Sequence, residues 1–125
     1  MIRSILLAGT GGFLGTVSRF LASRYFAAYF PSSFPYGTFV VNMTGCFLIG
    51  LLYGIAEKGD FINAEWRLFL MVGFCGGFTT FSAFAAENMA MLRDNEIFNF
   101  FLYTGSSIFI GLLATFAGIM LTKIF

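Results

Sequence analysis

Apolar residues fill four long stretches of the chain, and short polar segments separate them. Each stretch reaches the roughly 20 residues that a helix needs to cross the hydrocarbon of a bilayer. The stretches run from Ile5 to Phe30, Tyr36 to Ala56, Trp66 to Leu92 and Ile97 to Leu121. We therefore predict an all-α integral membrane protein, with four transmembrane helices in a single domain over residues 1–125.

The composition agrees with a membrane protein rather than a soluble domain. Hydrophobic residues make up 58% of the chain and charged residues 10%, which leaves too little polar surface to cover a water-soluble core. Arg3 followed by an apolar run is typical of a secretory signal, but this run exceeds a signal's usual apolar length and three more follow. An uncleaved first span is the better interpretation.

Conventional catalytic and metal sites lack their usual residues. The chain has no histidine, and its two cysteines, Cys46 and Cys75, both lie inside apolar stretches. Most carboxylates fall in the predicted loops, and Glu87 is the one inside a predicted span. We therefore predict that the protein is not an enzyme.

Positive charge is distributed almost evenly between the two sides of the membrane. Four spans place both termini and the middle loop on one side, with Arg3, Lys58, Arg67 and Lys123 there, and Arg19, Arg24 and Arg93 on the other. A bias this weak favours insertion in both orientations, and two inverted copies could then pair. The alternative is that charge details beyond a count select one orientation.

The third apolar stretch contains an unusual segment from Gly73 to Phe84. Gly76-Gly77 followed by Thr79-Thr80 is typical of a helix interrupted near the middle of the bilayer, where the freed backbone groups would need partners. Such interruptions often form ion sites. An unbroken helix whose glycines only permit close packing explains the same spacing, so both readings stay open.

Phe81 and Phe84, at i and i+3, share one helix face just after these glycines, with Thr80 and Ser82 beside the first ring. Aromatic rings carry positive edges, against which an anion can lie without meeting a full charge. Asn42 in the second span and hydroxyl groups in the fourth add donors that lipid cannot satisfy. The hydroxyl residues are Tyr103, Thr104, Ser106, Ser107 and Thr115, and the candidates for the ion path among them are Tyr103, Ser107 and Thr115.

Each of these features also has an ordinary structural explanation. A phenylalanine stripe commonly faces lipid or core, an asparagine commonly joins two membrane helices, and hydroxyls often bond back to their own helix. Arg19 lies toward the end of the first span, where a long side chain can reach water. The functional alternative places Arg19 at a pore mouth, where it would concentrate anions.

Three segments make the sequence resemble the Fluc (CrcB) family of bacterial fluoride channels. They are Gly12-Phe13-Leu14-Gly15 leading to Arg19, Gly37-Thr38 leading to Asn42 and Gly45, and Gly73-Phe74-Cys75-Gly76-Gly77 followed by Thr79-Thr80-Phe81-Ser82. The third segment is highly specific. The chain departs from the usual pattern at Phe78, often Leu, and at Ala83 and Ala85, where hydroxyl residues are common.

The resemblance implies a dual-topology antiparallel homodimer in the bacterial inner membrane, with fluoride exported passively through two pores. It assigns the fluoride path to phenylalanine ring edges and polar donors, which match Phe81, Phe84 and Asn42. It also implies a third helix broken near its middle and a structural sodium ion at the dimer centre. Backbone carbonyls at the break, here those of Gly76 and Thr79, would bind that ion.

Two other functions are compatible with four short apolar spans. A small multidrug-type proton-coupled exporter also has four short spans, but it needs a carboxylate embedded in the first span, and none is present there. A purely structural bundle would use every polar residue for helix packing. The fluoride channel is the function that the sequence favours.

Overall fold

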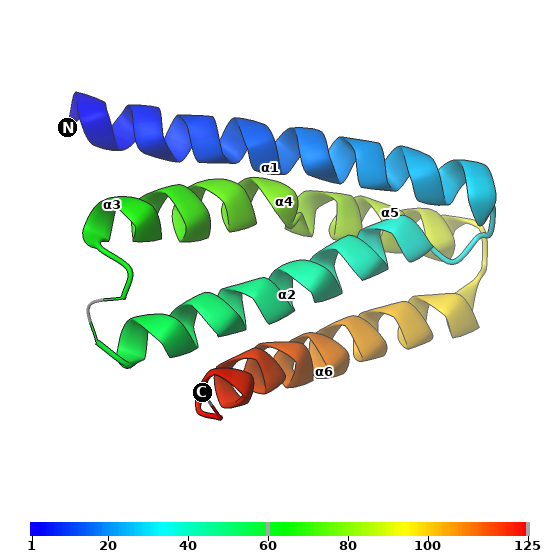
Figure 1. Cartoon of the computed structure of the whole chain (residues 1–125). Coiled ribbons are helices and arrows are strands. Elements are labelled where there is room, and N and C mark those ends of the chain that lie inside the picture. Colours follow the sequence, from blue (N-terminus) through cyan, green and yellow to red (C-terminus); the bar gives the residue numbers. More distant parts are fainter. Residues whose placement is uncertain (60, 125) are drawn as a thin grey trace.

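The computed structural model describes residues 1–59 and 61–124, and all its regular structure is helical (Figure 1). The three uninterrupted long helices are α1 (Ile2–Tyr29), α2 (Tyr36–Glu57) and α6 (Ile97–Thr122). The remaining span, Ala64–Arg93, consists of α3 (Ala64–Arg67), the π-helix η1 (Leu68–Cys75), α4 (Gly76–Phe78) and α5 (Phe81–Arg93). All four spans are long and apolar enough to cross a membrane, which confirms the predicted helical class.

The four spans alternate in direction, so both ends of the chain lie at the same end of the bundle (Figure 1). α1 packs mainly on η1 and α4, while α2 packs mainly on α6. α5 reaches α6 through a smaller contact. The bundle thus consists of two helix pairs, which are joined by the contact of α5 with α6 and by contacts of α2 with α1 and η1.

Glycines allow both pairs to pack backbone against backbone. A Cβ atom on Gly15 of α1 would overlap the Phe74 carbonyl oxygen of η1, so no side chain fits there. In the second pair, a Cβ on Gly118 of α6 would lie 2.5 Å from the Phe47 carbonyl oxygen of α2. These close approaches bring many atoms within van der Waals range, which is the main attraction between helices in lipid.

Two extended residues separate α4 from α5. Thr79 has φ −88° and ψ 156°, and Thr80 has φ −149° and ψ 118°, so neither continues a helical ladder. The glycine pair itself stays helical, because α4 includes both Gly76 and Gly77. Gly77 instead admits the backbone of α1, since a Cβ there would lie 2.5 Å from the Gly12 carbonyl oxygen.

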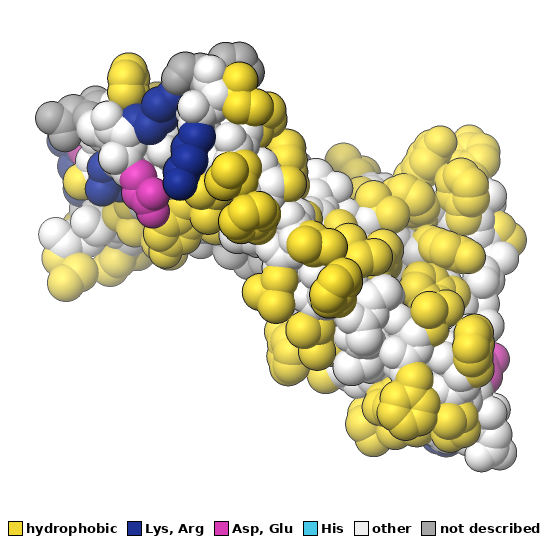
Figure 2. Space-filling model, turned by 90° about the horizontal axis from the view of Figure 1, so that it is seen from below, with side chains coloured by type: hydrophobic (Ala, Val, Ile, Leu, Met, Phe, Trp, Pro, Cys, Tyr) yellow, Lys and Arg dark blue, Asp and Glu magenta, His cyan; other side chains and the backbone are white. Residues whose placement is uncertain are grey.

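Many apolar side chains lie on the face of the molecule shown in Figure 2. Large side chains such as Phe13, Phe101 and Leu112 are about two-thirds exposed, at 67%, 67% and 69%. In this view Lys, Arg, Asp and Glu side chains gather mainly at one end of an elongated body (Figure 2). Arg3 forms an ion pair with Glu65 at the end that holds the chain termini. An apolar girdle with charged ends is the surface expected of a protein surrounded by lipid.

Candidate functional site

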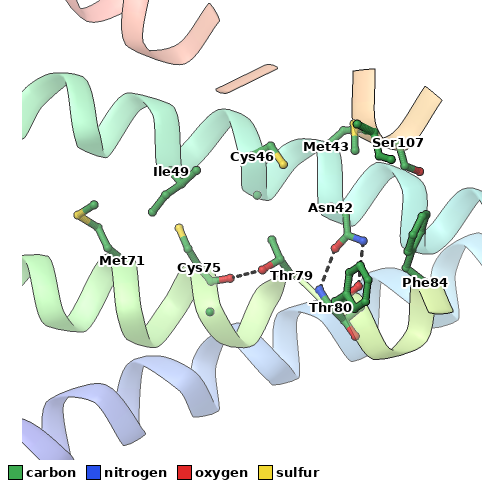
Figure 3. A pocket seen from close by; sticks show the side chains of 14 residues that line it. Asn42, Met43, Cys46, Ile49, Met71, Cys75, Thr79, Thr80, Phe84 and Ser107 are labelled. Carbon is green, nitrogen blue, oxygen red and sulfur yellow. Dashed lines mark hydrogen bonds between the residues drawn. The ribbon is translucent and has the colours of Figure 1, made fainter. Parts of the chain in front are cut away.

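A pocket of about 440 Å³ lies where α2, the two extended threonines and α6 meet (Figure 3). Its lining combines apolar side chains with a small number of polar groups, the usual character of a binding site. Five predicted site residues on its wall are Asn42, Thr80, Phe81, Phe84 and Ser107, and the pocket also includes Gly76 and Thr79. Residues from three different spans thus come together here.

Asn42 closes the gap in the third span with a matched pair of hydrogen bonds. Its amide nitrogen donates to the Thr80 carbonyl oxygen at 3.0 Å, and the Thr80 N–H donates to the Asn42 side-chain oxygen at 2.8 Å (Figure 3). The amide therefore replaces the helical partners that an extended Thr80 forgoes. Asn42 joins two helices and at the same time lines the pocket.

The two threonines cap the half-helices on either side of them. The Thr79 N–H and hydroxyl both donate to the Cys75 carbonyl oxygen, at 3.0 and 2.8 Å. The Thr80 hydroxyl oxygen accepts from the Ala83 N–H at 3.2 Å, a side-chain cap for the start of α5. It also lies 3.3 Å from the Ser82 hydroxyl, so Ser82 sits next to the pocket without lining it.

Arg19 lies against the end of α4 rather than on the pocket wall. Its Nε donates to the Gly77 carbonyl oxygen at 3.1 Å. A cation at this place complements the negative end of the helical segment formed by η1 and α4. The structure therefore gives Arg19, a half-buried residue, a partner at the helix gap.

Three aromatic rings form a continuous row from the pocket into the α5–α6 contact. The centroids of Phe81 and Phe84 are 5.6 Å apart, and those of Phe84 and Tyr103 are 4.9 Å apart. Phe81 is 78% exposed, whereas Tyr103 is fully buried. The row thus leads from the exposed surface into the interior and brings Tyr103 close to the two predicted phenylalanines.

The remaining predicted hydroxyls on α6 have different environments. The Ser107 hydroxyl oxygen is buried, and no described residue forms a hydrogen bond with it. Thr115 lies further along α6, outside the pocket, where its hydroxyl donates to the carbonyl oxygens of Cys46 and Gly111, both at 3.1 Å. Within residues 1–59 and 61–124, Ser107 therefore keeps a hydroxyl without a partner at the pocket wall, while Thr115 joins α6 to α2.

Sequence reasoning missed two polar clusters at the α5–α6 contact. The carboxylate of Glu87 accepts from the Thr38 hydroxyl at 3.0 Å and from the Tyr103 hydroxyl at 3.1 Å. The next residue, Asn88, accepts from the Thr104 hydroxyl at 3.0 Å through its side-chain oxygen. Glu87 and Asn88, as polar residues inside an apolar span, were the available signal, but their partners lie 16 or more positions away.

Comparison with known proteins identifies the family. Residues 6–119 match the family model described as "CrcB-like protein, Camphor Resistance (CrcB)". A Flavobacterium psychrophilum protein named "Fluoride-specific ion channel FluC" is 43% identical over 122 residues, which cover 98% of each chain. A Chlorobium luteolum protein of the same name is 48% identical over 120 residues, covering 96% of this chain and 92% of that one. On these matches, which span almost its full length, the chain belongs to the CrcB-like family.

Proposed function

We propose that this protein is a fluoride-specific ion channel that lets cytoplasmic fluoride leave the cell down its gradient. The observation that carries the proposal is the near full-length similarity to proteins named as fluoride-specific ion channels. The protein is a multi-pass membrane protein that transports rather than catalyses. The family assignment does not favour the proton-coupled drug exporter.

The pocket offers a physical basis for passing fluoride without trapping it. Fluoride must exchange its water for donors that hold it weakly enough to permit exit. The unpaired Ser107 hydroxyl and the Phe81 and Phe84 ring edges are donors of this kind, because none carries a full positive charge. In this proposal the row from Phe81 to Tyr103 forms part of the path.

Flux from reconstituted vesicles tests this function directly. Purified protein in liposomes loaded with potassium fluoride is expected to release fluoride without a pH gradient once valinomycin lets potassium leave and balance the charge, as followed with a fluoride electrode. Phe81→Ile and Phe84→Ile, which keep bulk but remove the ring edge, are expected to slow release at least about tenfold. Protein-containing vesicles that retain fluoride as well as protein-free vesicles do would refute the channel. Cation uptake driven by a pH gradient would support the proton-coupled drug exporter.

We further propose that two inverted copies form the working unit in the bacterial inner membrane. The nearly even distribution of cations, four on the side of the termini against three on the other, supports insertion in both orientations. The pocket supports a second copy, since it is open to the surface and Phe81 on its wall is 78% exposed. A partner covering this face would enclose the ring row and shield it from lipid.

We also propose that the carbonyl groups of Gly76 and Thr79 bind a structural Na⁺ at such an interface. Gly76 is exposed, and a Cβ there would meet nothing within 4 Å, so a second copy has room to approach. The extended Thr79 directs its carbonyl outside a helical ladder. When bound, Na⁺ would supply the positive charge that offsets carbonyl dipoles brought together from both copies.

Replacing sodium with another cation tests the proposed Na⁺ site. Exchange of Na⁺ for N-methyl-D-glucamine is expected to lower both the thermal stability of the dimer and its fluoride flux, and addition of Na⁺ should restore both. Potassium serves as the control for ionic strength. Stability and flux that are the same in all three cations would rule out a structural sodium ion.

A further inference from the structure

A polar pair, Asn88 on α5 and Thr104 on α6, links these two helices near the aromatic row. Asn88 is 6% exposed, so its amide must find partners inside the protein. Its oxygen accepts from the Thr104 hydroxyl at 3.0 Å, and its nitrogen donates to the Phe84 carbonyl oxygen at 3.1 Å. One side chain therefore connects the backbone at Phe84 with the neighbouring helix.

This connection acts at a residue of the proposed fluoride path. The Phe84 ring packs against Tyr103, and Thr104 follows Tyr103 directly on α6. α5 is also held by the neighbouring Glu87, whose carboxylate accepts from the Tyr103 hydroxyl of α6 and the Thr38 hydroxyl of α2, but neither of those bonds reaches the backbone at Phe84. The ring contact and the Asn88–Thr104 hydrogen bond therefore both bear on how Phe84 is presented to the pocket.

We propose that Asn88 and Thr104 are positioning residues that fix the Phe84 ring for fluoride passage. The proposal rests on the channel function above, but neither residue lines the pocket. Loss of the Thr104 hydroxyl would leave the Asn88 oxygen buried without its donor, at a site that water does not reach easily. The Asn88 amide would then rotate, or α5 would shift, to find another donor for that oxygen. Either change would displace the Phe84 ring.

Thr104→Val tests the proposal, because valine matches threonine in shape and lacks only the donor. Initial fluoride efflux per folded dimer is expected to fall about tenfold, the effect of roughly 1.4 kcal/mol from one lost buried hydrogen bond. Thr104→Ser retains a hydroxyl and should keep most of the flux. Ser106→Ala is the matched control, since that hydroxyl donates within its own helix, to the Leu102 carbonyl oxygen.

A positional readout separates positioning from general stability. 4-Fluorophenylalanine at position 84 should show a ¹⁹F resonance that moves in Thr104→Val and stays in place in Thr104→Ser and Ser106→Ala. If Thr104→Val does not fold, Thr104→Ala removes the same donor with less bulk. An unmoved resonance or an unchanged flux overturns the proposal, whereas a wild-type protein without flux would instead refute the channel.

Discussion

At the scale of single residues, the pairing of Asn42 with Thr80 is the contact on which the site most depends. The side-chain amide supplies both a donor and an acceptor to one extended peptide unit. Water normally satisfies such groups in a loop, but the hydrocarbon region of a bilayer offers none. Asn42 thus permits an extended segment to exist at this depth.

Asn42→Leu keeps the size of the side chain and removes both hydrogen bonds. Leaving the Thr80 N–H and carbonyl without partners should cost about 2–5 kcal/mol of folding free energy, and fluoride efflux should fall more than tenfold. Thermal unfolding in detergent and efflux from vesicles measure the two effects. Thr44→Val, an exposed position on the same helix, is the control, and equal behaviour of the two variants would contradict this role.

At the scale of helices, the crossing of α1 with the third span depends on the absence of side chains. Gly11 and Gly15 of α1 both lie so close to carbonyl oxygens of η1 that a Cβ would overlap them. Backbone atoms form the obstacle, so rotation of a side chain cannot relieve the overlap. The two helices would have to move apart, and the dispersion contacts along their length would weaken.

Gly15→Ala is therefore expected to destabilise the protein by about 1–3 kcal/mol, the usual effect of overpacking, and to lower the unfolding midpoint. Gly9→Ala on the same helix is the matched control, because a Cβ there meets nothing within 4 Å. This control should be neutral or slightly stabilising, since alanine favours helix. Thermal unfolding in detergent distinguishes them, and equal midpoints would contradict the steric argument.

The sequence predicts some levels of this structure better than others. Hydropathy averages over about 20 residues, so the four spans emerge with boundaries only a few positions away from those observed. The Gly76-Gly77 signal is more ambiguous, because both glycines are helical and the extended residues are Thr79 and Thr80. Glycine permits close backbone approach as readily as a change of direction, and only the neighbouring helix decides which one it serves.

The candidate site is predictable as a set of residue types but not as a set of contacts. Asn42 and Thr80 stand out in an apolar chain because lipid cannot satisfy their polar groups. The phenylalanines stand out because they cluster beside these polar residues. Their partners depend on helix rotation, which a single sequence does not specify. Ser107 and Thr115 show this, since both are hydroxyl residues on α6, yet one is unpaired beside the pocket and the other bonds to the α2 backbone.

At the scale of the whole molecule, the distribution of Lys and Arg between the two ends influences membrane orientation, and therefore how two copies could pair. The end with the termini carries Arg3, Lys58, Arg67 and Lys123, and the other end carries Arg24 and Arg93 with Arg19 beside the helix gap. Orientation follows the Lys and Arg difference, while carboxylates contribute little. A small difference would supply both orientations from one gene, as an inverted pair requires.

Shifting this charge difference tests the inverted pair. Arg24→Gln with Arg93→Gln leaves the terminal end with the clear excess of cations, and Arg3→Gln, Ser32→Lys and Lys123→Gln together reverse that excess. Each variant alone should insert in one orientation and lose at least about tenfold of the fluoride flux, because its inverted partner becomes scarce. Labelling of introduced cysteines from one side of the membrane measures orientation.

Co-expression of the two oppositely biased variants is the decisive arm of this test, because it supplies both orientations again. Flux should return toward the wild-type level, and crosslinks should join the two different chains. None of the substituted residues lines the pocket, so a lost flux that co-expression restores cannot come from damage to the path itself. Full flux from either variant expressed alone, with its orientation shown to be uniform, would mean that parallel copies or a single copy suffice.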